Sequence, residues 1–119
     1  MLNLLGIAMH TMNVQTKYYN LLKSGRKTIE LRLFDEKRQK IKVGDEIVFS
    51  DASDPHEQFK AVVVKLHKAP SFEALCQLIT PQQAGFSSKQ ELVSVLEGFY
   101  TPAAQKNFGV VGIEIKRLS

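Results

Sequence analysis

The side chains best suited to chemistry in this sequence gather in segment 25–32, which reads GRKTIELR. Lys27 supplies an amine, Glu30 a carboxylate and Arg32 a guanidinium. The amine could contact a phosphate, donate a hydrogen bond to the carbonyl of a base, or act as a general base. The last role requires the pKa of Lys27 to fall by several units, through burial or through nearby cations such as Arg26 and Arg32. The segment therefore predicts either a binding site or a catalytic site.

Glu30 decides between these two roles. If its carboxylate pairs with Lys27, it stabilises the ammonium form and opposes catalysis by a neutral amine. A catalytic lysine therefore requires Glu30 to pair with Arg32 instead, or to act as the base itself. Glu30 and Arg32 could also form a plain surface ion pair, worth about 0.5 kcal/mol. This conflict favours binding over catalysis.

The elements around the segment follow from its apolar spacing. Residues 14–23 have apolar side chains at helical spacing, and Gly25 stands where a left-handed helix cap favours glycine. Apolar and polar residues then alternate, which is typical of a strand with one buried face. Glu30 and Arg32 share the polar face of this strand. Lys27 precedes the strand, and we expect it in the turn, from where it can reach a cleft.

The rest of the chain predicts a mixed α and β domain. Further strands are expected at 1–9, 47–49, 59–66 and 108–115, and further helices at 71–78 and 88–99, with a short helical turn after Thr101 and Pro102. The second of these helices opens with a Ser-x-x-Glu capping box at Ser88. Segment 50–58 is expected to be a surface loop. Short strands that outnumber the helices favour a small, bent sheet closing into a barrel over a doubly wound parallel sheet.

Length and composition bound the kind of protein. The chain has 119 residues, of which 44% are hydrophobic, and is expected to form a single domain over 1–119. Segment 1–9 is apolar but lacks a basic start, a cleavage site and the roughly 20 residues needed to span a bilayer. The single cysteine, Cys76, predicts a reducing, cytoplasmic location. His10 and His67 are too far apart to predict a metal site, and we expect no cofactor.

Positive charge is concentrated around the same segment. The chain has a net charge of +4, but residues 23–42 hold eight basic and three acidic residues, which leaves the remainder at −1. This stretch predicts a phosphate-bearing partner such as RNA, with Arg38 and Lys40 as non-specific contacts. A solvated lysine-rich loop is the alternative. Beyond this stretch, Phe99 is expected in the core, whereas Tyr100 could present its ring or hydroxyl to a base.

The string Gly25-x-Lys27-x-x-Glu30-x-Arg32 matches the signature of the ASCH family at every defined position. Nearly the whole chain resembles small bacterial members of that family, including the ending FGVVGIEI at 108–115. The resemblance implies an α+β fold, namely a PUA-like small β-barrel with flanking helices and a cleft lined by the signature residues. It also implies a partner that is RNA or a modified nucleoside or nucleotide, and we expect such a ligand at these residues.

Some small ASCH proteins are amidohydrolases that remove the acetyl group from N4-acetylcytidine with a lysine, a threonine and a glutamate. The lysine corresponds to Lys27, but the position of the threonine is Glu30, and the glutamate falls near Gly85. An enzyme would therefore rely on Lys27 and Glu30, with Glu30 activating water. A metal-independent ribonuclease is another alternative, with Lys27 and Arg32 stabilising the phosphate and Glu30 as the base for the 2′-hydroxyl. A protein-interaction module ranks last, and a binding module remains the first hypothesis.

Overall fold

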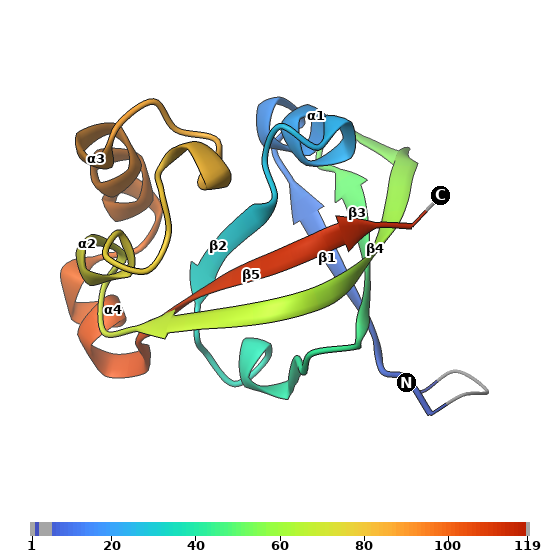
Figure 1. The fold of residues 1–119 in the computed structure, drawn as a ribbon, viewed down its shortest axis with the longest axis horizontal. Helices are drawn as coiled ribbons and strands as arrows, with labels where there is room; N and C mark the ends of the chain where they lie inside the picture. The colour runs from blue at the N-terminus through green and yellow to red at the C-terminus, as the bar shows by residue number, and fades with distance from the viewer. Residues whose placement is uncertain (1, 3–5, 119) are drawn as a thin grey trace.

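The computed structural model describes residue 2 and residues 6–118, which form one curled five-stranded sheet with helices packed against it (Figure 1). The strands are β1 (Met9–Val14), β2 (Ile29–Leu33), β3 (Glu46–Asp51), β4 (Asp54–Ala69) and β5 (Val110–Arg117). The helices are α1 (Thr16–Ser24), α2 (Phe72–Leu75), α3 (Lys89–Phe99) and α4 (Pro102–Phe108), with 3-10 turns η1 (Arg38–Lys40) and η2 (Gln82–Ala84). The expected α+β architecture is confirmed.

The sheet has the strand order β1-β3-β4-β5-β2. β1 and β3 run parallel, and the other neighbouring strands run antiparallel. The pairing of β4 shifts register against β3 near Ser50 and against β5 between Val63 and Lys65. Bulges of this kind bend a strand and increase its twist, so they help β4 to curl the sheet into a half-barrel.

Two hydrophobic clusters hold the fold together. The first packs α1 onto β1, β3, β4 and β5 and includes Tyr19, Leu22, Ile47, Phe49, Phe59 and Ile113. The second joins β2 and β5 to α2 and α3 and includes Ile29, Phe72, Leu75, Leu92, Leu96 and Val110. In Figure 1 the helices α2, α3 and α4 gather on one side of the sheet, while α1 lies across its upper edge. Tyr18 packs against both clusters and so marks the line where they meet.

The predicted helix ends are confirmed by their caps. Gly25 closes α1 with φ of +82°, in the left-handed region that favours glycine. The Ser88 hydroxyl accepts a hydrogen bond from the backbone N–H of Glu91 at 3.1 Å. The carboxylate of Glu91 reaches back to the N–H of Ser87, one residue earlier than in the standard capping box. Thr101 caps α4 through its own hydroxyl, ahead of a proline at the start of the helix.

Three predicted elements differ from the structure. The first strand was expected at 1–9, where residues 1 and 3–5 lie outside the described residues; β1 instead occupies Met9–Val14. The surface loop expected at 50–58 is wrong, because β3 runs to Asp51 and β4 already begins at Asp54. This part of β4 extends beyond its pairing with β5, and such an edge position tolerates Pro55. The helix expected at 71–78 is helical only over Phe72–Leu75.

Candidate functional site

A pocket of about 190 Å³ opens between the start of α1, strand β2 and helix α3. It is lined by Asn13, Val14, Gln15, Tyr18, Lys27, Glu30, Leu31, Arg32, Phe86, Val95, Leu96, Phe99 and Tyr100. The set includes four residues that the sequence singled out, namely Lys27, Glu30, Arg32 and Tyr100. Because Tyr18 is also in it, the pocket lies where the two hydrophobic clusters meet.

The turn between α1 and β2 directs Lys27 into the protein. The N–H of Gly25 donates to the Leu22 carbonyl at 3.2 Å, and the N–H of Lys27 then donates to the Leu21 carbonyl at 3.0 Å. The chain is thereby folded back along the helix, although Gly25 itself does not line the pocket. Lys27 is 3% exposed, and its Nζ donates to the Ala84 carbonyl at 2.8 Å. The amine therefore forms part of the buried floor of the pocket.

Gly85 leaves room for the Lys27 side chain. Its φ is +88°, and a Cβ added there would lie 3.2 Å from Cδ of Lys27 and 3.3 Å from Cδ1 of Leu21. Both the positive φ and these close contacts favour glycine at this position. The family resemblance placed the amidohydrolase glutamate near this position. The structure thus brings that position next to Lys27, but without a carboxylate.

Glu30 contacts two cations at once. Its Oε1 lies 3.2 Å from Nζ of Lys27, while its Oε2 accepts from Nε of Arg32 at 2.9 Å and lies 2.8 Å from Nη2 of Arg32. Nη2 also donates to the Asn13 carbonyl at 2.9 Å, which ties β2 to β1. None of these three charged side chains is more than 15% exposed. Two buried cations therefore share one carboxylate.

Burial and charge act in opposite directions on this cluster. Burial lowers the pKa of Lys27, because the ammonium loses its water; Glu30 opposes the shift, and Arg32 adds to it. Burial alone would raise the pKa of Glu30, but Lys27 and Arg32 together outweigh burial and lower that pKa. Glu30 is therefore a carboxylate at neutral pH and a weak base.

Aromatic rings form the wall around the amine. Nζ of Lys27 lies 5.3 Å from the ring centre of Tyr18 and 5.8 Å from that of Phe86, and the two ring centres are 5.6 Å apart. A cation this close to a ring face is attracted by the ring quadrupole. The sequence indicated Tyr18 only as an apolar residue of the first helix, and nothing in it indicated Phe86. Only the tertiary fold brings the two rings to the lysine.

Phe99 and Tyr100 differ from the prediction in which of the two is more deeply buried. Phe99 was expected in the core but is 57% exposed, so that prediction is wrong. Tyr100 is half-buried and packs on Phe72 with ring centres 5.7 Å apart. The α3 helix ends at Phe99, and the chain becomes extended at Tyr100, which turns its ring inward. Both residues nevertheless line the pocket.

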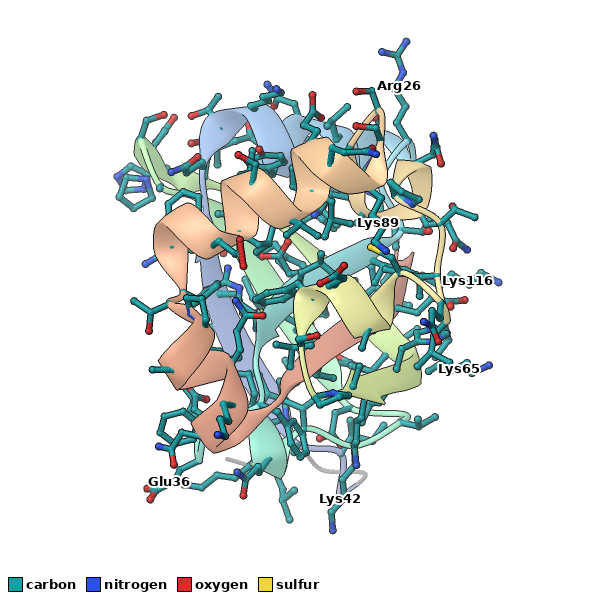
Figure 2. The ribbon with its side chains drawn as sticks, turned by 90° about the vertical axis from the view of Figure 1, so that its left-hand side faces the viewer. Arg26, Glu36, Lys42, Lys65, Lys89 and Lys116 are labelled. Carbon is teal, nitrogen blue, oxygen red and sulfur yellow. The ribbon has the colours of Figure 1, made fainter. Side chains whose placement is uncertain are left out.

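The basic residues after β2 lie outside the pocket. Arg38 pairs with Asp35, with Nη1 and Oδ2 3.0 Å apart, and Lys40 borders a separate shallow depression next to Asp35. Figure 2 shows Arg26 at one end of the molecule and Lys42 at the opposite end. The basic stretch of the sequence is therefore dispersed over the surface rather than gathered into one patch around the pocket.

The histidines are engaged in pairs away from the pocket. Nε2 of His10 lies 2.8 Å from Oδ2 of Asp45, and Nε2 of His67 lies 2.8 Å from Oε1 of Glu114. Among the described residues, no group of three or more His, Cys, Asp or Glu side chains could hold a metal ion. In the same part of the chain, no helix has the length and apolarity needed to cross a membrane.

The curled sheet, its flanking helices and the pocket between them define a PUA-like half-barrel domain. The family model described as "ASCH domain" matches residues 12–119, and the chain therefore belongs to the ASCH domain family. No curated protein matches the chain significantly.

Solved structures support this assignment. The chain is similar to the crystal structure of the hypothetical protein PH0355, with 35% identity, a TM-score of 0.82 and coverage of 92% of this chain and 99% of that one. It is also similar to the solution structure of PF0455 from Pyrococcus furiosus, with 33% identity, a TM-score of 0.74 and coverage of 93% and 98%. The protein EF3133 from Enterococcus faecalis V583 shares the fold at 14% identity and a TM-score of 0.64, with coverage of 94% and 80%. The predicted family and fold are thus confirmed.

Proposed function

We propose that the pocket binds a nucleobase, either in a nucleoside or unpaired in RNA, and that Lys27, Glu30 and Arg32 contact its polar edge. The observation that carries this proposal is the position of the three charges, which lie at the floor of a pocket whose walls are aromatic and aliphatic. Nucleobases combine a flat apolar face with a hydrogen-bonding edge, so they fit walls and a floor of this kind.

The size of the pocket favours a single six-membered ring. A protein cavity of about 150 Å³ accepts benzene. A pocket of about 190 Å³ therefore fits a pyrimidine with its ring substituents more closely than a purine. Its walls include Tyr18, Phe86 and Tyr100, whose rings can stack on or pack against a base.

The charged floor also has hydrogen-bonding capacity to spare. An ammonium has three N–H donors, and the described contacts of Lys27 engage two of them, at Ala84 and at Glu30. Arg32 has five donors, more than its contacts with Glu30, Asn13 and the Tyr100 side chain use. A carboxylate offers about four lone-pair sites, so Glu30 can accept another hydrogen bond. Cytosine suits this set, because its amino group can donate to Glu30 while its carbonyl accepts from a cation.

Isothermal titration calorimetry with cytidine, uridine, N4-acetylcytidine, adenosine and guanosine tests the proposal. We expect the pyrimidine nucleosides to bind more tightly than the purines. Lys27→Met removes one charge-assisted hydrogen bond, worth about 1.5–3 kcal/mol, and should weaken binding roughly tenfold to a hundredfold. Arg26→Met is the matched control, because Arg26 is the adjacent basic residue and projects into solvent (Figure 2). Equal effects of the two substitutions, or no binding by any nucleoside, would contradict the proposal.

Hydrolysis of an acetylated base is a second candidate. The observation that favours it is the 3.2 Å contact between Lys27 and Glu30 at the floor of the pocket, with Gly85 beside the lysine. In such a reaction Glu30 would activate water for attack on the acetyl carbonyl, and Lys27 would protonate the leaving amine. The lowered pKa of Glu30 makes it a poor base, so this activity ranks below binding.

Incubation with N4-acetylcytidine separates the two candidates. Chromatography should show cytidine accumulating with the wild-type protein and not with Lys27→Met if the protein is an amidohydrolase. Binding without cytidine formation leaves a binding protein. Equal turnover by the two proteins would indicate a contaminating hydrolase.

A further inference from the structure

The rim of the pocket differs in character from its floor. Here the rim means the three pocket-lining residues that are exposed, namely Asn13, Gln15 and Phe99. None of them carries a charge, whereas the charged residues Lys27 and Glu30 are both buried below. A ligand that fills the pocket therefore meets charge at its inner end and mainly neutral polar groups at its outer end, where the partly exposed Arg32 guanidinium is engaged by Glu30 and by the Asn13 carbonyl.

At the two polar rim residues the backbone is held in position, whereas the side-chain amides are free to bind. The backbone carbonyl of Asn13 accepts from Arg32 at 2.9 Å, and that of Gln15 accepts from the N–H of Tyr19 at 2.9 Å. Within the described part of the chain, neither side-chain amide has a hydrogen-bond partner. Each amide offers two donors and one acceptor oxygen, which is the mixture that a sugar hydroxyl can satisfy.

We infer that the rim is a ribose subsite, in which Asn13 and Gln15 hydrogen-bond the sugar hydroxyls and Phe99 covers the carbon face of the sugar. This inference rests on the proposed function, because a base must fill the floor to bring its ribose to the rim. It names the ligand class more narrowly, as a free ribonucleoside without a phosphate. A 2′-hydroxyl both donates and accepts, so an amide at the rim can distinguish ribose from deoxyribose.

The charges next to the rim argue against a phosphate there. The α1 N-terminus follows Gln15, and its first residue, Thr16, donates to the carboxylate of Asp51 at 2.6 Å. Hydrogen bonds from Thr16 and from Ser53 lower the pKa of Asp51 and keep it ionised. The Lys17 ammonium lies 5.7 Å from the centre of the Tyr18 ring, so a cation and a carboxylate both stand at this end of α1. Arg26 and Lys42 lie at opposite ends of the molecule (Figure 2), and neither lines the pocket. The described residues therefore form no cationic groove at the rim for a nucleic-acid backbone.

The test compares four ligands by calorimetry: cytosine, cytidine, 2′-deoxycytidine and cytidine 5′-monophosphate. Cytidine should bind more tightly than cytosine, and also more tightly than 2′-deoxycytidine. Each rim hydrogen bond should contribute roughly two- to tenfold in affinity. The 5′-phosphate should add nothing, and cytidine affinity should change little between 50 and 200 mM salt.

Asn13→Ala and Gln15→Ala should each reduce cytidine affinity by this factor and leave cytosine affinity unchanged. Asn20→Ala is the matched control, because Asn20 is an exposed amide on α1 that does not line the pocket. If cytosine binds through Lys27 but the sugar adds no affinity, or the rim variants bind cytidine normally, the ribose subsite is refuted and the base site stands. If the monophosphate or a cytidine oligonucleotide binds tenfold more tightly and loses that gain in salt, the ligand is a nucleotide or RNA and the inference fails. If none of the four binds, the proposed function fails together with it.

Discussion

Glu30→Gln tests whether the charged floor is a single electrostatic unit. The substitution keeps the shape of the side chain but removes the carboxylate that Lys27 and Arg32 share. Breaking a buried ion pair by removing one partner costs about 3–5 kcal/mol, because the other charge is left uncompensated. That is a large share of the roughly 5–15 kcal/mol by which a domain is stable. With a urea m-value of about 2 kcal/mol/M, the unfolding midpoint should fall by about 2 M.

Urea unfolding at pH 7, followed by far-UV circular dichroism, measures this loss. Glu97→Gln, on the exposed face of α3, is the matched control and should shift stability by less than about 0.5 kcal/mol. In a Lys27→Met background one buried cation is already gone, so Glu30→Gln should cost at least about 1 kcal/mol less than in the wild type. A loss below about 1 kcal/mol in the single variant, or strict additivity in the double variant, would refute the idea of a shared carboxylate.

The pH dependence of the free energy of unfolding, compared between the wild type and Glu30→Gln, provides a second measurement. The pKa of Glu30 is lower in the folded than in the unfolded protein, so its stabilising contribution is complete above the unfolded value of about 4.3. The contribution is lost as the pH falls through the lowered folded value. The difference in free energy of unfolding between the wild type and Glu30→Gln should therefore be constant near neutral pH and shrink in acid. A difference that grows in acid would contradict this assignment of charge.

Two further substitutions test the packing around the site. Gly85→Ala places a side chain at a φ of +88° and against Lys27. Urea unfolding should therefore show a loss of about 1–2 kcal/mol in stability, and calorimetry should show weaker cytidine binding. Unchanged stability would contradict the close fit. Tyr19→Phe removes the 2.7 Å hydrogen bond from the Tyr19 hydroxyl to Glu57 and should cost about 1 kcal/mol of stability at pH 7 without affecting cytidine binding. Because the pKa of Tyr19 is raised by burial and by Glu57, this cost should fade as the pH rises above about 10.

The sequence predicted helix ends well, because the residues that determine them are neighbours in the chain. Gly25, Ser88 and Thr101 cap the helices that their positions indicated, because a cap depends on only a few neighbouring residues. The extent of β4 could not be predicted, because residues 54–58 have a loop-like composition and join the strand through the pairing of Asp54 and Gln58 with β3. Phe99 had the correct helical spacing for the core, but Tyr100 takes the inward position by packing on Phe72.

The candidate site was predictable only in part, for the same reason. The sequence brought Lys27, Glu30 and Arg32 together because they are neighbours in the chain. It could not predict the Tyr18 and Phe86 walls or the Asn13 rim, since these lie on other elements. The sequence also predicted a single basic patch that the fold does not form. Like charges that are close in sequence point to opposite ends of the molecule after folding (Figure 2). A run of lysines and arginines predicts a patch only where the backbone keeps the side chains on one face.

The spacing of the signature residues acquires a physical meaning in this fold. On a regular strand Lys27 and Glu30, three residues apart, would point to opposite faces. The left-handed cap at Gly25 ends α1 before the strand begins, and the N–H of Lys27 remains bonded to the helix at Leu21. The lysine therefore leaves the chain from a turn and reaches the same face as Glu30, while Arg32 reaches it by strand alternation. The motif thus specifies a helix end, a turn and a strand in the order that brings two cations to one carboxylate, and changing the spacing by one residue would separate them.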